Sequence, residues 1–158
     1  MLAACGTNTS GDPLVVKTEA GMIHGFMDEE IYAFAGIPYC KAERFMPPQK
    51  ADVWKGVLEC TKYPPRSMQQ MRPIENDPLG LSEEGATRLN VWTSDVNGKM
   101  PVMVWLHGGG FSSGAGYNNP NDSGRGLARQ GVGCPTFRVF SFRVCWSVRP
   151  YFHSTAYR

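Results

Sequence analysis

The sequence predicts an α/β protein. Residues 14–35 read as short β-strands separated by turns, residues 102–106 form an almost wholly apolar strand, and residues 123–130 fit a short helix. A strand as apolar as 102–106 is expected where both faces of a sheet are covered. With 158 residues, the chain is long enough for one domain with a core.

The first elements predict an antiparallel meander. Three runs rich in β-branched and aromatic residues, 14–18, 22–27 and 31–35, are separated by Gly21 and by an acidic turn at 28–30. Residues 36–80 then hold seven prolines, too many for helix interiors or central strands. We therefore expect a long irregular excursion over the surface, of the kind that is usually functional.

The later elements are a pair of strands and a helix. Residues 89–93 and 102–106 read as strands, and the Asn-Gly pair within 95–98 predicts a hairpin turn after the first of them. The helix at 123–130 would be capped by Ser123 or Asp122 and would end at Gly131. Residues 133–158 show neither strand alternation nor a helical period.

Charge along the chain is uneven. The net charge is +2, but residues 133–158 contain four arginines, no lysine and no acidic residue, and without them 12 basic and 14 acidic residues leave −2. The first 132 residues show no basic stripe with aromatic residues on one face, so we predict no nucleic-acid partner. No apolar stretch is long enough for a transmembrane helix.

The five cysteines form no C-x-x-C pair, and the three histidines do not cluster with them, so we predict no metal site. Leu2-Ala3-Ala4-Cys5 resembles a lipobox, in which the cysteine is lipidated after signal cleavage. Residues 1–13 are then either a lipoprotein signal remnant with a polar tether, or the match is a coincidence. The first alternative places the protein outside the cytoplasm, anchored through Cys5, and the second in the cytoplasm.

A glycine-rich tract directly follows the 102–106 strand, and it carries the candidate site. His107-Gly108-Gly109-Gly110 suits neither a phosphate-binding loop, since no lysine occurs from Met100 onward, nor a dinucleotide fingerprint, since each G-x-G lacks the third glycine. Gly110-Phe111-Ser112-Ser113-Gly114 matches G-x-S-x-G, but that motif places its serine directly between a strand and a helix, so we exclude Ser112 as a nucleophile. The alternatives left are a flexible turn and an oxyanion hole, in which backbone N–H groups bind the developing negative charge of an attacked carbonyl.

Several segments resemble, in the same order, those of the type B carboxylesterases, the family that includes the cholinesterases. The matching segments are FAGIPY (34–39) with Arg44-Phe45 and Pro47-Pro48, WKG (54–56), YP (63–64) with Gln69-Gln70, SEE (82–84) with LNVW (89–92), and VMVWLHGGGF (102–111). Together they span residues 14–132, which we interpret as the N-terminal portion of a carboxylesterase domain.

The resemblance implies the N-terminal part of an α/β-hydrolase fold, incomplete, with a mixed, mostly parallel sheet after the antiparallel meander. It implies hydrolysis of small-molecule carboxylic esters by a serine triad, without a cofactor. The N–H groups of Gly109 and Gly110 would be the oxyanion donors, supported by His107 and Gly108, and Phe111 would wall the acyl pocket. Arg44 would pair with Glu83, unless these are two solvated charges.

Two departures from the family pattern stand out. Ser67 takes the place of one cysteine of a loop-closing disulfide whose partner is also absent, so Cys40 and Cys60 are expected to be buried free thiols. No triad serine, acid or histidine has a counterpart in the required order, and His153 is rejected as a base. We therefore expect this chain to be inactive alone and residues 133–158 to be an atypical tail, either out-of-frame or unrelated sequence. The alternative function is a non-catalytic cholinesterase-like interaction module.

Overall fold

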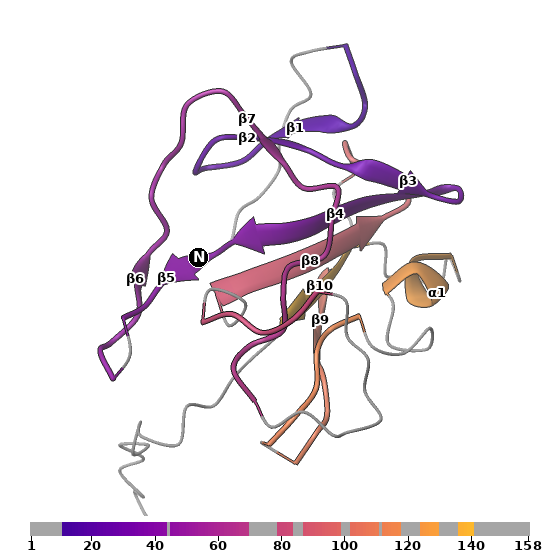
Figure 1. Ribbon diagram of the computed structural model, residues 1–158. Coiled ribbons are helices and arrows are strands. Elements are labelled where there is room, and N and C mark those ends of the chain that lie inside the picture. Colours follow the sequence, from indigo (N-terminus) through magenta and orange to yellow (C-terminus); the bar gives the residue numbers. More distant parts are fainter. Residues whose placement is uncertain are drawn as a thin grey trace, which may run out of the picture.

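A computed structural model describes residues 11–43, 45–69, 79–83, 87–98, 102–110, 112–117 and 124–129, together with the backbone of Thr136–Phe140. Within these ranges the chain forms three sheets and one short helix (Figure 1). No helix in the described part has the length and apolar character needed to cross a bilayer.

The smaller of the two main sheets contains three strands in the order β1-β2-β7. Strand β1 (Val15–Lys17) pairs antiparallel with β2 (Met22–His24), and β2 pairs parallel with β7 (Val57–Glu59). The indole N–H of Trp54, just before β7, donates to the Met22 carbonyl at 2.7 Å. This bond fastens the middle of the proline-rich segment to the N-terminal strands.

The larger sheet contains five strands in the order β3-β4-β8-β10-β9. The strands are β3 (Phe26–Asp28), β4 (Ile31–Pro38), β8 (Arg88–Thr93), β10 (Thr136–Phe140) and β9 (Val102–Leu106). The first three neighbouring pairs are antiparallel and the β10–β9 pair is parallel. The sheet is therefore mixed, as predicted, but the pairings in its described part are mostly antiparallel and not mostly parallel. The parallel pairing thus occurs at the end of the sheet that carries the glycine-rich tract.

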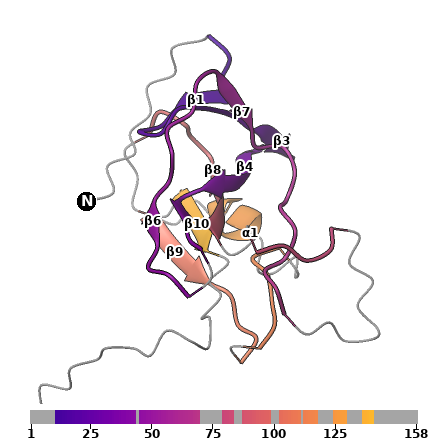
Figure 2. The same ribbon diagram turned by 60° about the vertical axis from the view of Figure 1, so that its left-hand side comes forward.

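Strand β4 sends its side chains alternately into two apolar clusters, because successive side chains of a strand point to opposite faces. Ala33 packs with Trp92 and Ala128, while Phe34 packs with Ile23 and Cys60. The first cluster lies toward helix α1 (Gly124–Arg129) and the second toward the small sheet. Figure 2 shows the small sheet above the β3–β4 edge and α1 beside β8 and β10.

The predicted meander is present, with one difference. The run 22–27 is interrupted at Gly25, so four strands form where three were expected, and they are shared between the two sheets. The proline-rich segment is irregular in its described part, apart from the end of β4, strand β7 and the two-residue strands β5 (Cys40–Lys41) and β6 (Gln49–Lys50).

The predicted hairpin turn at 95–98 is wrong. The turn itself forms, and the Asp95 side chain accepts the Asn97 N–H at 2.8 Å. However, β10 lies between β8 and β9 and pairs with both, so β8 and β9 are not neighbours. Residues 136–140, in the tail that shows no strand alternation in its sequence, form β10 and occupy an interior position of the sheet.

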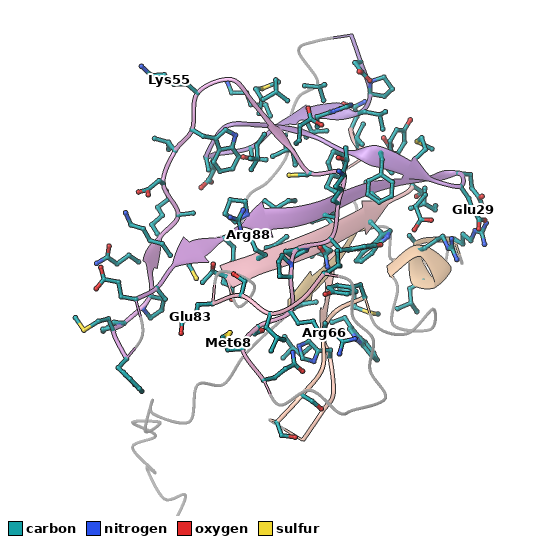
Figure 3. The ribbon with its side chains drawn as sticks, in the orientation of Figure 1. Glu29, Lys55, Arg66, Met68, Glu83 and Arg88 are labelled. Atoms are coloured by element: carbon teal, nitrogen blue, oxygen red, sulfur yellow. The ribbon has the colours of Figure 1, made fainter. Side chains whose placement is uncertain are left out.

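Helix α1 confirms the expected helix, and its capping residues lie outside the described part. Two glycines in six residues make it a poor helix by propensity, so tertiary contacts must hold it. Arg125 Nη1 lies 2.8 Å from Asp28 Oδ1, and Arg129 forms two bonds to Glu30, at 2.6 and 2.9 Å. Figure 3 shows Glu29, in the same turn between β3 and β4, facing this helix.

Candidate functional site

The candidate site is the segment directly after β9, residues 107–114, which we call the glycine loop. It lies below the main sheet, in the lower orange part of the ribbon (Figure 1). Residues 108–110 are exposed, whereas Ala115 and Gly116 directly after the loop are buried. The loop is thus exposed to solvent, and the residues that directly follow it are buried.

A tight turn organises the centre of the loop. The Gly109 carbonyl accepts the backbone N–H groups of Ser112 and Ser113, at 3.0 and 3.1 Å. Gly109 has φ +133°, and a Cβ at this position would overlap the Ser113 carbonyl oxygen. The turn therefore requires glycine at position 109.

A second close approach brings the end of the loop against its beginning. Gly114 has φ +121°, and a Cβ there would lie 2.5 Å from the Gly108 oxygen and 2.6 Å from His107 Nδ1. By contrast, a Cβ on Gly108 would meet nothing within 4 Å. The loop thus needs glycine where its backbone closes on itself, and position 108 is not one of those places.

The side chain of Gln69 holds this closed end. Its Oε1 accepts the Gly114 N–H at 2.6 Å, and its Nε2 donates to the Gly114 carbonyl and to the Ser67 carbonyl, each at 3.0 Å. Two carbonyls need a donor and one N–H needs an acceptor, which fixes the orientation of the amide. Sequence reasoning named Gln69 as part of a family motif and assigned it no role.

His107, at the junction of strand and loop, faces inward. Its Nδ1 lies 2.7 Å from the Gly108 carbonyl oxygen, which can accept but not donate, so Nδ1 carries the proton. The other ring nitrogen, Nε2, is buried and has no hydrogen-bond partner among the described residues. His107 therefore supports the loop through its ring nitrogen Nδ1.

The backbone N–H groups of Gly109 and Gly110 have no acceptor among the residues that the structure describes. Both residues have positive φ, +133° and +58°, and both are exposed. Backbone N–H groups without an internal acceptor can donate to an anionic oxygen. Chemically, the loop offers these two donors in a segment where the N–H groups of Ser112, Ser113 and Gly114 are bonded.

The Ser112 hydroxyl takes part in the turn. Its Oγ donates to the Gly109 carbonyl at 3.1 Å. A nucleophilic serine needs an imidazole or another base at that distance, and a carbonyl oxygen cannot remove a proton. The geometry around Ser112 is that of a turn residue.

Other predicted site residues are only partly described. Cys5, Arg44 and Phe111 lie outside the described residues, so the lipidation site, the pair of Arg44 with Glu83 and the acyl-pocket wall stay predictions. Among the described residues, no group of three or more His, Cys, Asp or Glu side chains could hold a metal ion.

The two described cysteines differ in burial. Both thiols are free, but Cys60 is 1% exposed and Cys40 is partly exposed, so the expectation of a buried thiol is met in full for Cys60 alone. Burial raises the pKa of Cys60 to about 12 and also raises the pKa of Cys40. Ser67, at the position of the missing family cysteine, is buried at 4% exposure.

A cavity of about 260 Å³ lies elsewhere, between the small sheet and the β4–β8 face of the large one. Phe34, Trp54 and Val91 form part of its apolar wall, and no residue of the glycine loop lines it. The cavity is therefore separate from the candidate site.

Comparisons with known proteins agree with the motifs. A family model described as "Carboxylesterase family" matches residues 12–132. Para-nitrobenzyl esterase of Bacillus subtilis (strain 168) is 36% identical over 129 residues, covering 74% of this chain and 25% of the relative. Carboxylesterase 1D of Rattus norvegicus is 38% identical over 135 residues, covering 70% and 24%.

A solved structure is similar as well. The carboxylesterase of Geobacillus stearothermophilus aligns with a TM-score of 0.68 and 35% identity, over 80% of this chain and 25% of that one. The chain thus spans about a quarter of the length of these relatives. Its fold is the N-terminal part of an α/β-hydrolase, and the chain belongs to the carboxylesterase family.

Proposed function

We propose that the glycine loop is the oxyanion-binding half of a carboxylic-ester hydrolase site, with a small-molecule ester as the substrate. The observation that carries the proposal is the pair of N–H groups of Gly109 and Gly110, which have no acceptor among the described residues, whereas the N–H groups of Ser112, Ser113 and Gly114 later in the loop are bonded. Similarity to carboxylesterases supports ester hydrolysis as the reaction.

The proposed role is electrostatic. When a nucleophile attacks an ester carbonyl, the carbonyl oxygen becomes negative, and donors already aimed at that oxygen stabilise the transition state without reorganising. Loss of one such donor lowers kcat by about 100- to 1,000-fold in well-studied cases. Neither glycine makes or breaks a bond in this account.

The 158 residues supply these donors and, by their sequence, no nucleophile, acid or base in the order that the family uses. We therefore expect no hydrolysis of a p-nitrophenyl ester above the background rate, and no difference between this chain and its Ser112→Ala variant. Activity that Ser112→Ala abolishes would show that Ser112 is a nucleophile and would contradict the proposal.

A chimera tests the donor role itself. Residues 12–132 replace the matching quarter of the Bacillus subtilis para-nitrobenzyl esterase, which supplies the remainder of the site. We expect the folded chimera to hydrolyse a p-nitrophenyl ester, and Gly109→Ala to lower kcat far more than Gly108→Ala does, with little change in KM. A folded chimera in which both substitutions leave kcat unchanged would contradict the proposal and favour the non-catalytic interaction module.

A further inference from the structure

We propose that Gln69 is a positioning residue, whose side-chain amide holds the glycine loop in the shape that presents the Gly109 and Gly110 N–H groups. This inference deepens the proposed function and rests on it for its catalytic meaning. The contact itself does not depend on it, since it is a feature of the described residues.

The two partners are 45 residues apart in the sequence and come from different parts of the fold. Gln69 belongs to the proline-rich segment, and Gly114 closes the glycine loop. Figure 3 labels Arg66 and Met68 on this segment, which passes beside the loop below β8. The proline-rich segment, which was predicted to be irregular, therefore contacts the candidate site and forms hydrogen bonds with it.

The contact joins two fixed points. On one side, the Gln69 amide is anchored to the carbonyl of Ser67, which is 4% exposed. The backbone there is tied to a neighbouring segment, since the Ser82 N–H donates to the Arg66 carbonyl at 2.7 Å. On the other side, Gly114 directly precedes Ala115, which is 2% exposed. Because both ends of this contact are attached to buried residues, the contact restrains the adjacent glycine loop.

The restraint reaches the donors through the turn. Gly109 is bonded to Ser112 and Ser113 through its carbonyl, and Gly114 is the next residue along. With Gly114 held at both its N–H and its carbonyl, the turn between positions 109 and 113 has little freedom to rotate. The directions of the Gly109 and Gly110 N–H bonds follow from the orientation of these peptide planes. Gln69 therefore fixes these directions without contacting either glycine.

The geometry demands both functions of the amide. A carboxylate at position 69 could accept the Gly114 N–H but would face two carbonyl oxygens without a proton to donate. A protonated carboxyl group could do both, because one oxygen accepts and the other donates. Gln69→Glu is therefore a pH-dependent replacement for the native side chain, whereas Gln69→Met removes both functions at similar length.

The test uses the full 158-residue chain, labelled with ¹⁵N, and measures hydrogen exchange at individual amides. Protection factors, which correct for the intrinsic pH dependence of exchange, are compared for Gly114, for Ser112 and Ser113, and for strands β4 and β8. Gln49, an exposed residue of β6, provides the matched control Gln49→Met.

We expect Gln69→Met to lower the protection factor of Gly114 at least tenfold, with a smaller loss at Ser112 and Ser113 and none in β4 or β8. Gln49→Met should leave all of them unchanged. In Gln69→Glu, Gly114 should lose part of its protection at neutral pH, because the two carbonyl oxygens repel the carboxylate and displace it from the loop. It should regain that protection as the pH falls through the pKa of the new carboxyl group. A contact that merely fills space would show no such recovery.

Unchanged protection of Gly114 in Gln69→Met, or a Gln69→Glu variant whose Gly114 protection does not depend on pH, would overturn the inference. If Gln69→Met unfolds the sheet as well, the pH dependence of Gln69→Glu decides the question alone. Exchange does not require ester turnover. An inactive chimera with the expected exchange pattern would therefore refute the proposed function and leave the positioning role intact. An active chimera without the expected exchange pattern would refute the positioning role and leave the proposed function intact.

Discussion

At the scale of the residue, the three consecutive glycines are not equivalent. Position 109 must be glycine because the Ser113 carbonyl oxygen occupies the place that a Cβ would take, whereas a Cβ on Gly108 would have no atom within 4 Å. A sequence can show a run of glycines, but it cannot show which member the backbone packs against. The family resemblance indicated Gly109 and Gly110 as donors, and it gave no role to Gln69, whose partner lies 45 residues away.

Alanine substitutions test this difference directly. Gly109→Ala should destabilise the turn by about 1–3 kcal/mol, because an L-residue is strained at φ +133° and its Cβ would displace Ser113. Gly108→Ala, the matched control, should change stability by less than about 0.5 kcal/mol. Amide exchange at Ser112 and Ser113 reports the turn, and equal effects of the two substitutions would contradict the structure.

The buried thiol of Cys60 predicts a loss of stability in alkali. Burial raises its pKa from 9.0 to about 12, so between these values the unfolded chain releases a proton that the folded chain keeps. The contribution of Cys60 is therefore fully present below pH 9 and is lost as the pH rises toward 12. Tyr63, whose pKa burial raises from 10.0 to about 12, adds to the same decline.

Cys60→Ala should flatten this decline, even though it lowers stability at neutral pH by leaving a cavity. Urea unfolding at pH 7 and pH 10.5 measures the difference, with Cys40→Ala as the control because the Cys40 thiol is less buried. A decline that is equally steep in Cys60→Ala and in the unsubstituted chain would contradict the assignment.

At the scale of the element, strands with a strong local sequence pattern were predicted, whereas strands that depend on pairing with distant segments were missed. The aromatic and β-branched residues of β4 and the apolar run of β9 predicted these two strands without any other information. Strand β7 was missed because its three residues lie in a proline-rich context. Strand β10 was missed because its five residues carry too short a pattern, and its position depends on β8 and β9, which flank it.

Helix α1 shows how a weak element is held by its neighbours. Arg125 reaches Asp28, which also accepts the indole N–H of Trp92 at 3.3 Å, and the two charged side chains are 31% and 18% exposed. A double-mutant cycle with Arg125→Met and Asp28→Asn should give a coupling of roughly 1 kcal/mol that falls with added salt.

The Lys41–Asp52 pair is the matched control for this cycle. Its nitrogen and oxygen lie 2.7 Å apart, but its side chains are 52% and 77% exposed, so its coupling should be at most roughly 0.5 kcal/mol. Equal couplings for the two pairs would show that partial burial does not strengthen the contact between α1 and the β3–β4 turn.

Strand β9 presents an apolar edge. All five of its side chains are exposed, from Trp105 at 37% to Leu106 at 60%, and in the described sheet one edge of the strand has no partner. Coverage of both faces, which its composition predicts, is therefore not found among the described residues. An unblocked apolar edge favours association of chains.

Val104→Lys should raise the concentration at which the chain begins to aggregate, because a charge in an edge strand opposes further pairing. Val53→Lys is the control, since Val53 is 76% exposed but lies outside any strand. Light scattering against protein concentration measures the effect, and an equal gain in both variants would mean that added charge alone is responsible.

At the scale of the whole molecule, topology explains why the candidate site lies where it does. The large sheet ends at β9, and the glycine loop leaves the end of that strand, while the proline-rich segment crosses below the sheet to meet it. The family and the fold class could be predicted from ordered motifs, because these encode local backbone shapes. The contact between the glycine loop and the proline-rich segment could not be predicted, because it depends on how the sheets pack.

The central claim is that a bonded loop presents two unbonded N–H groups, and amide exchange along residues 108–114 of the unsubstituted chain tests it most directly. We predict exchange near the intrinsic rate at Gly109 and Gly110 and clear protection at Ser112, Ser113 and Gly114. Protection at Gly109 and Gly110 would show that these amides are already bonded, and uniform fast exchange would show that the loop has no fixed shape. Either result would contradict the account.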